Sequence, residues 1–150
     1  MKKILLTLFI LSASANAYAY KVGDTVSPEI AQHLKLNKNG ITAVNFFASW
    51  CVSCRKELPL VNKLSKTIAK NYSIIGVDAD ETLKEGLAFQ KALGLTFYIY
   101  NDVKQKVTAS FNPIGMPALY YIKANKVVKV RIGAINHIDK VILKDLELLK

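Results

Sequence analysis

Residues 43–54 read Ala-Val-Asn-Phe-Phe-Ala-Ser-Trp-Cys-Val-Ser-Cys, an apolar run that leads directly into a Cys-x-x-Cys motif. The charged stretch that starts at Arg55 is typical of a helix. A cysteine in the first turn of a helix lies beside unpaired N–H groups and the positive end of the helix dipole, so its thiolate is favoured. The spacing predicts that Cys51 attacks a disulfide and that Cys54, one helical turn later, resolves the mixed disulfide.

Two other interpretations of the motif are weaker. A zinc site needs about four ligands, and the chain offers only His33 and His137 besides its two cysteines, far from the motif in sequence. A purely structural disulfide would close a very small loop, where the entropic gain is least. A redox role for Cys51 and Cys54 is therefore the favoured interpretation.

The length and the first residues indicate one exported domain. The chain has 150 residues, of which 51% are hydrophobic and 21% charged, enough for a single core. Residues 1–19 combine a basic start, an apolar run and an Ala-Tyr-Ala end, so they predict a secretory signal cleaved between Ala19 and Tyr20. The apolar run is short for a membrane span, and anchoring by an uncleaved N-terminus is the less favoured alternative. Residues 20–150 would form the mature domain.

The chain is basic, with a formal net charge of +10. Its lysines are scattered and lack an aromatic platform, so a nucleic-acid partner is not expected. A solvated lysine-rich surface is the favoured interpretation, and steering toward an acidic partner or an anionic membrane is the alternative.

Hydrophobic spacing and turn residues predict an α/β order of elements. Helices are expected over 28–36, 52–70, 83–93, 102–111 and 136–149, and strands over 41–48, 73–78, 95–100, 118–123 and 126–132. The alternation of strands and helices predicts parallel pairing, and the closely spaced last two strands predict a hairpin. The sheet should therefore be mixed. The strand over 41–48 lacks alternation, which indicates burial on both faces and leaves Asn45 in need of polar partners.

Taken together, these features resemble a known family. The run Asn-Phe-Phe-Ala-Ser-Trp-Cys-x-x-Cys-Arg-Lys-Glu-Leu-Pro, the later Gly-x-Pro turn at 115–117 and the terminal hairpin plus helix resemble the thioredoxin fold. More narrowly, they resemble the exported TlpA/ResA/CcmG type of thioredoxin-like disulfide reductase. The resemblance implies a central mixed sheet flanked by helices, with an extra strand–helix insertion, residues 83–111, before a cis-proline turn.

The resemblance also implies roles for particular residues. The Met116–Pro117 bond would be cis and face the cysteines, and Met116 would offer backbone hydrogen bonds to the client. Trp50 would contribute to the same client-binding surface. Glu81, after the second central strand, would manage the proton of Cys54; the alternative is an exposed acid at the start of the next helix. No cofactor and no metal are implied.

Three functions remain open from the sequence. The favoured one is an exported, monomeric reductase of client disulfides, such as those of cytochrome c apoproteins, re-reduced by a membrane electron donor of the DsbD/CcdA type. The second is an exported dithiol oxidase, which uses the same residues in the opposite direction. The third is a copper-handling assembly module that adds Met116 or His137 to the cysteines. Val52-Ser53 lacks the proline common in relatives, and Ala118 replaces a common threonine, so the redox potential and the client stay open.

Overall fold

The computed structural model describes residues 19–150. The predicted secretory signal therefore lies, apart from Ala19, outside the described residues. The elements are α1 (Pro28–His33), β1 (Ile41–Phe47), α2 (Val52–Ser65), β2 (Tyr72–Asp78), α3 (Leu83–Ala92), β3 (Ile99–Asn101), α4 (Lys106–Phe111), β4 (Ala118–Lys123), β5 (Lys126–Ile132) and α5 (Ile138–Leu148). None of the helices in this part of the chain is long and apolar enough to span a bilayer.

The five strands form one mixed sheet in the order β3-β2-β1-β4-β5. β1 and β3 both run parallel to β2, whereas β4 runs antiparallel to β1 and to β5. The predicted central strand, the C-terminal hairpin and the mixed pairing are therefore confirmed. The α3–β3 unit follows β2 and precedes the turn into β4, as the expected insertion requires.

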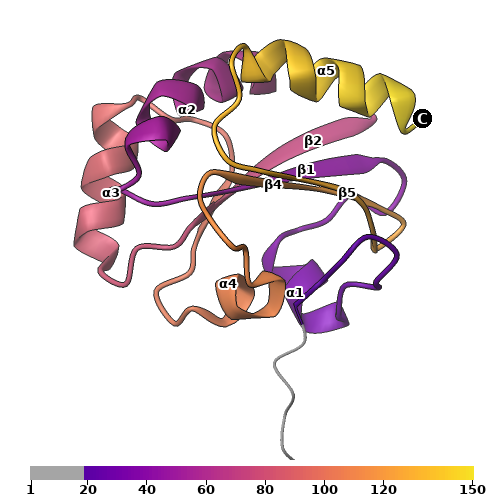
Figure 1. Cartoon of the computed structure of the whole chain (residues 1–150), viewed down its shortest axis with the longest axis horizontal. Coiled ribbons are helices and arrows are strands. Elements are labelled where there is room, and N and C mark those ends of the chain that lie inside the picture. Colours follow the sequence, from indigo (N-terminus) through magenta and orange to yellow (C-terminus); the bar gives the residue numbers. More distant parts are fainter. Residues whose placement is uncertain (1–18) are drawn as a thin grey trace, which may run out of the picture.

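Helices cover both faces of this sheet (Figure 1). α1 and α4 lie on one face, where Val44 and Phe46 of β1 pack with Ile30 and Phe111. α2 and α5 lie on the other, where Ala43 packs with Val61 and Ile142, and α3 joins this face through contacts of Phe89 with Phe47. All seven residues of β1 are buried, which explains why its sequence lacks alternation.

Five predicted boundaries are wrong by two residues or more. α1 ends at His33 rather than at residue 36, and Lys35 adopts a left-handed conformation with φ 49°. α2 ends at Ser65 rather than at residue 70, and β3 begins at Ile99 rather than at residue 95. α4 begins at Lys106 because Gln105 adopts a left-handed conformation with φ 56° after a turn closed on Asp102. α5 begins at Ile138 rather than at Asn136, because His137 also adopts a left-handed conformation, with φ 53°. A helix cannot extend back through a left-handed residue.

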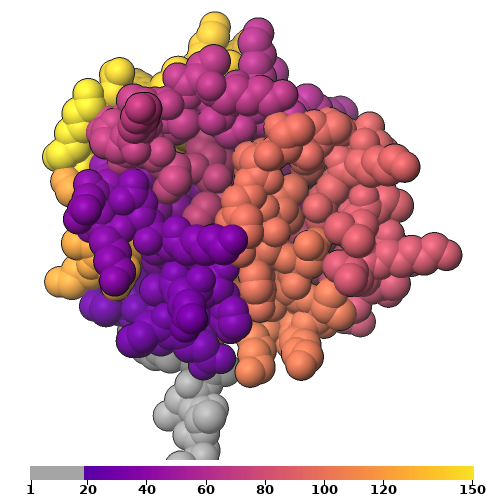
Figure 2. Space-filling view, turned by 180° about the vertical axis from the view of Figure 1, so that it is seen from behind, coloured from indigo at the N-terminus to yellow at the C-terminus, as the bar shows by residue number. Residues whose placement is uncertain are grey.

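The N-terminal segment packs against the insertion. The Tyr98 hydroxyl donates to the carbonyl oxygen of His33, and the rings of His33 and Tyr100 lie 5.2 Å apart. Figure 2 shows these early and middle parts of the chain side by side on one face of the molecule. Ser27 caps α1 by accepting the Ile30 N–H, as its position before Pro28 predicts.

Candidate active site

Cys51 and Cys54 form a disulfide at the start of α2. Cys51 is the N-cap residue, and its Sγ accepts the backbone N–H of Cys54 at 3.2 Å. A sulfur in this position lies against the unpaired N–H groups of the first helical turn, which stabilise a thiolate when the disulfide is reduced. The sequence-based expectation of a cysteine pair at a helix start is confirmed.

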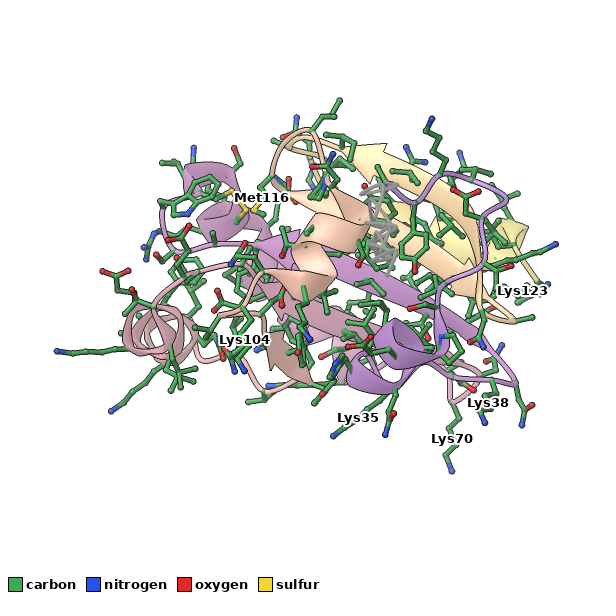
Figure 3. The ribbon with its side chains drawn as sticks, turned by 90° about the horizontal axis from the view of Figure 1, so that it is seen from below. Lys35, Lys38, Lys70, Lys104, Met116 and Lys123 are labelled. Carbon is green, nitrogen blue, oxygen red and sulfur yellow. A yellow bond between two sulfur atoms is a disulfide. The ribbon has the colours of Figure 1, made fainter. Side chains whose placement is uncertain are left out.

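The turn before β4 lies beside this disulfide. The Met116–Pro117 peptide bond is cis, as expected. Met116 packs against the cluster that contains both cysteines, and Figure 3 shows its side chain next to the disulfide sulfurs. Within residues 19–150 the backbone N–H and carbonyl of Met116 make no hydrogen bond.

Large apolar side chains near the motif are exposed. Trp50 and Val52 flank Cys51 and are 68% and 71% exposed. Ile114, two residues before Met116, is 93% exposed. Exposed apolar groups around a reactive pair are typical of a surface that contacts another molecule.

Glu57 is a buried acid that the sequence-based analysis did not single out. It lies on the inner face of α2, one turn after Cys54, and its Oε1 accepts the backbone N–H of Ile135 at 2.5 Å. Burial raises the pKa of Glu57, and the Ile135 hydrogen bond opposes that shift. Glu57 also lines a narrow crevice with Asn45 and Pro117. The sequence signal that could have identified Glu57 is its position three residues after Cys54, beside the apolar stripe of the helix.

The acids at the end of β2 and just after it differ in burial. Glu81 is exposed in the turn before α3, so the structure brings it to the surface rather than into the core, and its predicted role in proton transfer stays a prediction. Asp78 and Asp80, in contrast, are 2% and 5% exposed. The two oxygens of Asp80 accept the backbone N–H and the hydroxyl of Ser49, each at 2.8 Å. Asp80 therefore contacts the turn that carries Trp50.

Asn45 does not meet the expectation that its side chain is fully paired. It is 2% exposed, and its Oδ1 has no hydrogen-bond partner among residues 19–150. It points to the α2 face of β1, where it lines the crevice behind the cis turn with Glu57 and Pro117.

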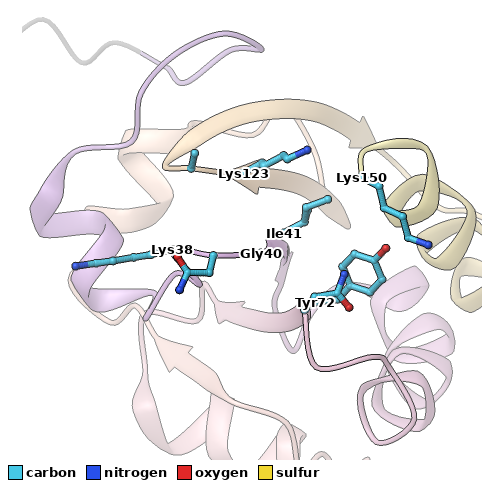
Figure 4. Close-up of a pocket in the computed structure, with 9 residues that line it drawn as sticks. Lys38, Gly40, Ile41, Tyr72, Lys123 and Lys150 are labelled. Carbon is cyan, nitrogen blue, oxygen red and sulfur yellow. The ribbon is translucent and has the colours of Figure 1, made fainter.

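One group of lysines lies away from the cysteines. Lys38, Lys123 and Lys150 surround a pocket that Ile41 and Tyr72 line at the first residues of β1 and β2 (Figure 4). The disulfide follows the other end of β1, about 20 Å along the strand. Among the described residues, no group of three or more His, Cys, Asp or Glu side chains could hold a metal ion.

Comparison with known proteins identifies a family and individual relatives. Residues 24–131 match the AhpC/TSA family. The chain is similar to the thiol-disulfide oxidoreductase ResA of Bacillus thuringiensis (strain Al Hakam), with 37% identity over 92 residues, covering 60% of this chain and 53% of that protein. It is also similar to the thioredoxin-like protein YneN of Bacillus subtilis (strain 168), with 33% identity over 89 residues, covering 57% and 52%. The matched part of the chain spans about half the length of these two relatives.

A solved structure shares the fold. The structure of a putative thiol:disulfide interchange protein DsbE from Chlorobium tepidum superposes with a TM-score of 0.72, 20% identity, and coverage of 87% of this chain and 98% of that one. The expected thioredoxin-like fold, with its central mixed sheet flanked by helices, is thereby confirmed.

Proposed function

Because this chain belongs to the AhpC/TSA family, we propose that it is a thiol–disulfide oxidoreductase that reduces disulfides in client proteins. The observation that carries this proposal is the Cys51–Cys54 disulfide at the start of α2, beside the cis turn at Met116. The ResA relatives, which are named thiol-disulfide oxidoreductases, support it.

The reaction needs two exchange steps. In the reduced protein, the Cys51 thiolate attacks one sulfur of the client disulfide, so a Cys51–client disulfide forms and the other client sulfur leaves as a thiolate. The Cys54 thiolate then attacks Cys51 Sγ, which forms the Cys51–Cys54 disulfide and releases the second client thiolate. Two electrons pass from the protein to the client. The two client thiolates take up protons, one of which originates from the Cys54 thiol.

Glu57 is the group that we assign to the Cys54 proton. It is buried on the same face of α2 as Cys54, and burial raises its pKa, so it binds a proton more readily than an exposed glutamate. Its hydrogen bond from Ile135 holds the carboxyl in one orientation. Glu81 remains the alternative that the family resemblance implies, and the two glutamine variants distinguish them.

The client would dock across the cis turn. The unpaired backbone N–H and carbonyl of Met116 can pair with an extended client segment as one strand pairs with another. Trp50 and Ile114 provide exposed apolar surface on either side of the cysteines. This arrangement favours an unfolded or extended client, a class to which a cytochrome c apoprotein would belong.

The proposed compartment rests on the N-terminal sequence, and the proposed electron donor rests on the redox conditions of that compartment. The N-terminal sequence is typical of export, and an exported compartment lacks a reduced thiol pool. A reductase there needs a dithiol donor in the membrane, of the DsbD/CcdA type, to reduce the Cys51–Cys54 disulfide again. A dithiol oxidase would use the same residues and differ only in the sign of the driving force.

Trapping and redox titration test the proposal. Cys54→Ser should accumulate a Cys51 mixed disulfide with a disulfide-bonded peptide, whereas Cys51→Ser should not. Equilibration of the native pair in glutathione or dithiothreitol buffers should give a potential near that of thioredoxin, about −270 mV. A value near that of DsbA, about −120 mV, would identify an oxidase. If neither cysteine reacted, the exchange mechanism would be wrong.

A further inference from the structure

The turn that carries Trp50 into Cys51 is held from the neighbouring strand end. Asp80 lies two residues beyond the end of β2, and its carboxyl accepts two hydrogen bonds from Ser49, one from the backbone N–H and one from the hydroxyl. Ser49 lies between the end of β1 and Trp50. Both oxygens of one carboxyl thus fix the residue at which the chain leaves the sheet for the cysteine motif.

Asp80 is supported by a second buried carboxyl. Asp78 accepts the backbone N–H of Asp80 at 3.0 Å through Oδ1, and the Gln90 side-chain amide at 2.6 Å through Oδ2. Asp78 also lies closely against α3, because a Cβ on Gly86 would be 2.5 Å from its Oδ2. The carboxyl of Asp78 is therefore confined between β2, Asp80 and α3.

The donors to these two carboxyls are neutral groups, so two negative charges would be poorly compensated. Burial raises the pKa of Asp78 to about 6, and the adjacent charge of Asp80 adds to the shift. Two charged groups from the surrounding helices, Arg55 of α2 and Glu85 of α3, line a pocket with Ser49. Asp102 after β3 donates its backbone N–H to the Asp78 carbonyl, and Glu81 follows Asp80 in sequence.

We propose that Asp80 is a positioning residue for the nucleophilic Cys51, and that protonation of Asp78 controls how firmly Asp80 holds the Ser49–Trp50 turn. While Asp78 keeps its proton, the pair carries one charge and both Ser49 contacts persist. When Asp78 ionises, the two buried carboxylates repel each other and the Ser49 contact loosens. The turn then presents Cys51 less well to a client disulfide. This inference rests on the proposed function, because it concerns the attack by Cys51.

Trp50 is the only tryptophan, so its emission reports directly on this turn. The titration uses the oxidised protein, in which the cysteines do not ionise. We expect the emission to change with a midpoint near pH 6. Asp78→Asn should abolish the change and keep the emission seen at low pH. Glu57→Gln, Glu81→Gln and Glu85→Gln should each retain the change, because these acids are not part of the Asp78–Asp80 contact.

An unchanged midpoint in Asp78→Asn, or a flat wild-type titration, would overturn the pH-dependent part of the inference. Loss of the transition in one of the three glutamine variants would assign it to that acid instead.

The positioning role has its own measurement, the rate at which the reduced protein attacks oxidised glutathione. Asp80→Ala should lower this rate about tenfold or more, as expected when a reacting group is misplaced. Asp80→Asn should restore part of the rate, because its amide oxygen still accepts one Ser49 donor. Ser49→Ala should cost less than Asp80→Ala, since the backbone N–H contact remains. Glu147→Gln, an exposed change on α5, controls for the loss of one negative charge.

These outcomes separate the inference from the proposed function. A folded Asp80→Ala protein with the wild-type rate would overturn the positioning role while leaving the exchange activity intact. A wild-type protein that never reacted with oxidised glutathione would refute the proposed function, and the emission titration would still decide whether the Asp78–Asp80 pair holds the turn.

Discussion

Glu57 on α2 accepts the backbone N–H of Ile135, which lies between β5 and α5, at 2.5 Å. This hydrogen bond joins the helix that carries the cysteines to the segment behind the cis turn. It also satisfies a backbone donor that would otherwise be partly buried without a partner. The same carboxyl thus has a structural contact through one oxygen and, in the proposed mechanism, a proton to transfer.

Replacement of Glu57 by glutamine separates these two roles. The amide oxygen of Glu57→Gln can still accept the Ile135 N–H, so the fold should persist. Loss of the carboxyl should slow the resolving step by roughly tenfold to a hundredfold at neutral pH, because general base catalysis is lost. The effect should shrink at alkaline pH, where Cys54 ionises without help. Stopped-flow measurement of release of the second thiol from a peptide disulfide tests this.

Glu81→Gln is the matched control for that experiment. This substitution removes an exposed carboxyl from the turn between β2 and α3. It should leave the rate of the resolving step within about twofold of wild type. The opposite ranking of the two variants would return the proton-transfer role to Glu81.

The ion pairs between β5 and α5 should stabilise the fold at neutral pH and lose this effect in acid. Asp145 is 1% exposed and pairs with Lys129 at 2.6 Å and with Arg131 at 2.5 Å. Burial alone would raise the pKa of Asp145, but the hydrogen bonds from Arg131 and Lys129 lower it to about 2. A carboxyl with a lowered pKa stabilises the folded state above its unfolded pKa, near 4, and this stabilisation is lost as the pH falls toward 2.

Asp145→Asn should therefore lower the free energy of unfolding by about 3 kcal/mol at pH 7, because two cations lose their buried partner. Urea unfolding at pH 7 and at pH 3 measures the difference, which should be smaller at pH 3. Glu147→Gln on the same helix should have an effect within about 0.5 kcal/mol. Equal losses for Asp145→Asn at both pH values would contradict the assignment of the lowered pKa.

Much of the fold could be predicted from the sequence because local signals and burial agree there. The unbroken apolar run of β1 has no stable place except a strand covered on both faces, and the two-residue gap at 124–125 allows only a hairpin. The starts of α4 and α5 could not be predicted, since Gln105 and His137 take left-handed conformations, which only a few per cent of non-glycine residues adopt.

The reactive cysteines of the site could be predicted from the sequence, but the buried acidic residues around them could not. The roles of Cys51 and Cys54 follow from one short motif, whereas the cis bond before Pro117 was expected only from the family resemblance, because few X–Pro bonds are cis. Glu57 was missed because a glutamate in a lysine-rich helix looks solvated, and only the packing of α2 against 133–138 shows that it is buried. Asp78 ends β2 and Asp80 lies two residues later, where acids are ordinary. The contact of Asp78 with Gln90 and that of Asp80 with Ser49 depend on other segments of the chain.

Replacement of Trp50 by alanine should weaken client recognition without reducing the stability of the fold. Its side chain is 68% exposed, so Trp50→Ala should change the free energy of unfolding by no more than about 0.5 kcal/mol. The rate with a disulfide-bonded peptide should fall about tenfold, whereas the rate with oxidised glutathione, which is too small to reach the apolar surface, should change little. Leu148→Ala, at an equally exposed position on α5, should alter neither rate. A similar loss with both substrates would mean that Trp50 acts on the chemistry of Cys51.

At Gly86 on α3, replacement of glycine by alanine should destabilise the protein, the opposite of its usual effect in a helix. Alanine normally stabilises a helix interior by about 1 kcal/mol relative to glycine. Here the added Cβ would lie 2.5 Å from Asp78 Oδ2, and the Asp78 carboxyl, held by Gln90 and Asp80, has little room to move. Gly86→Ala should therefore lower the free energy of unfolding, by roughly 1–3 kcal/mol, as overpacking of a core does.

Urea unfolding measures the loss. Ala88→Gly, at an exposed position of the same helix, is the control and should cost about 1 kcal/mol from helix propensity alone. A Gly86→Ala protein more stable than wild type would show that Asp78 is free to move away from α3.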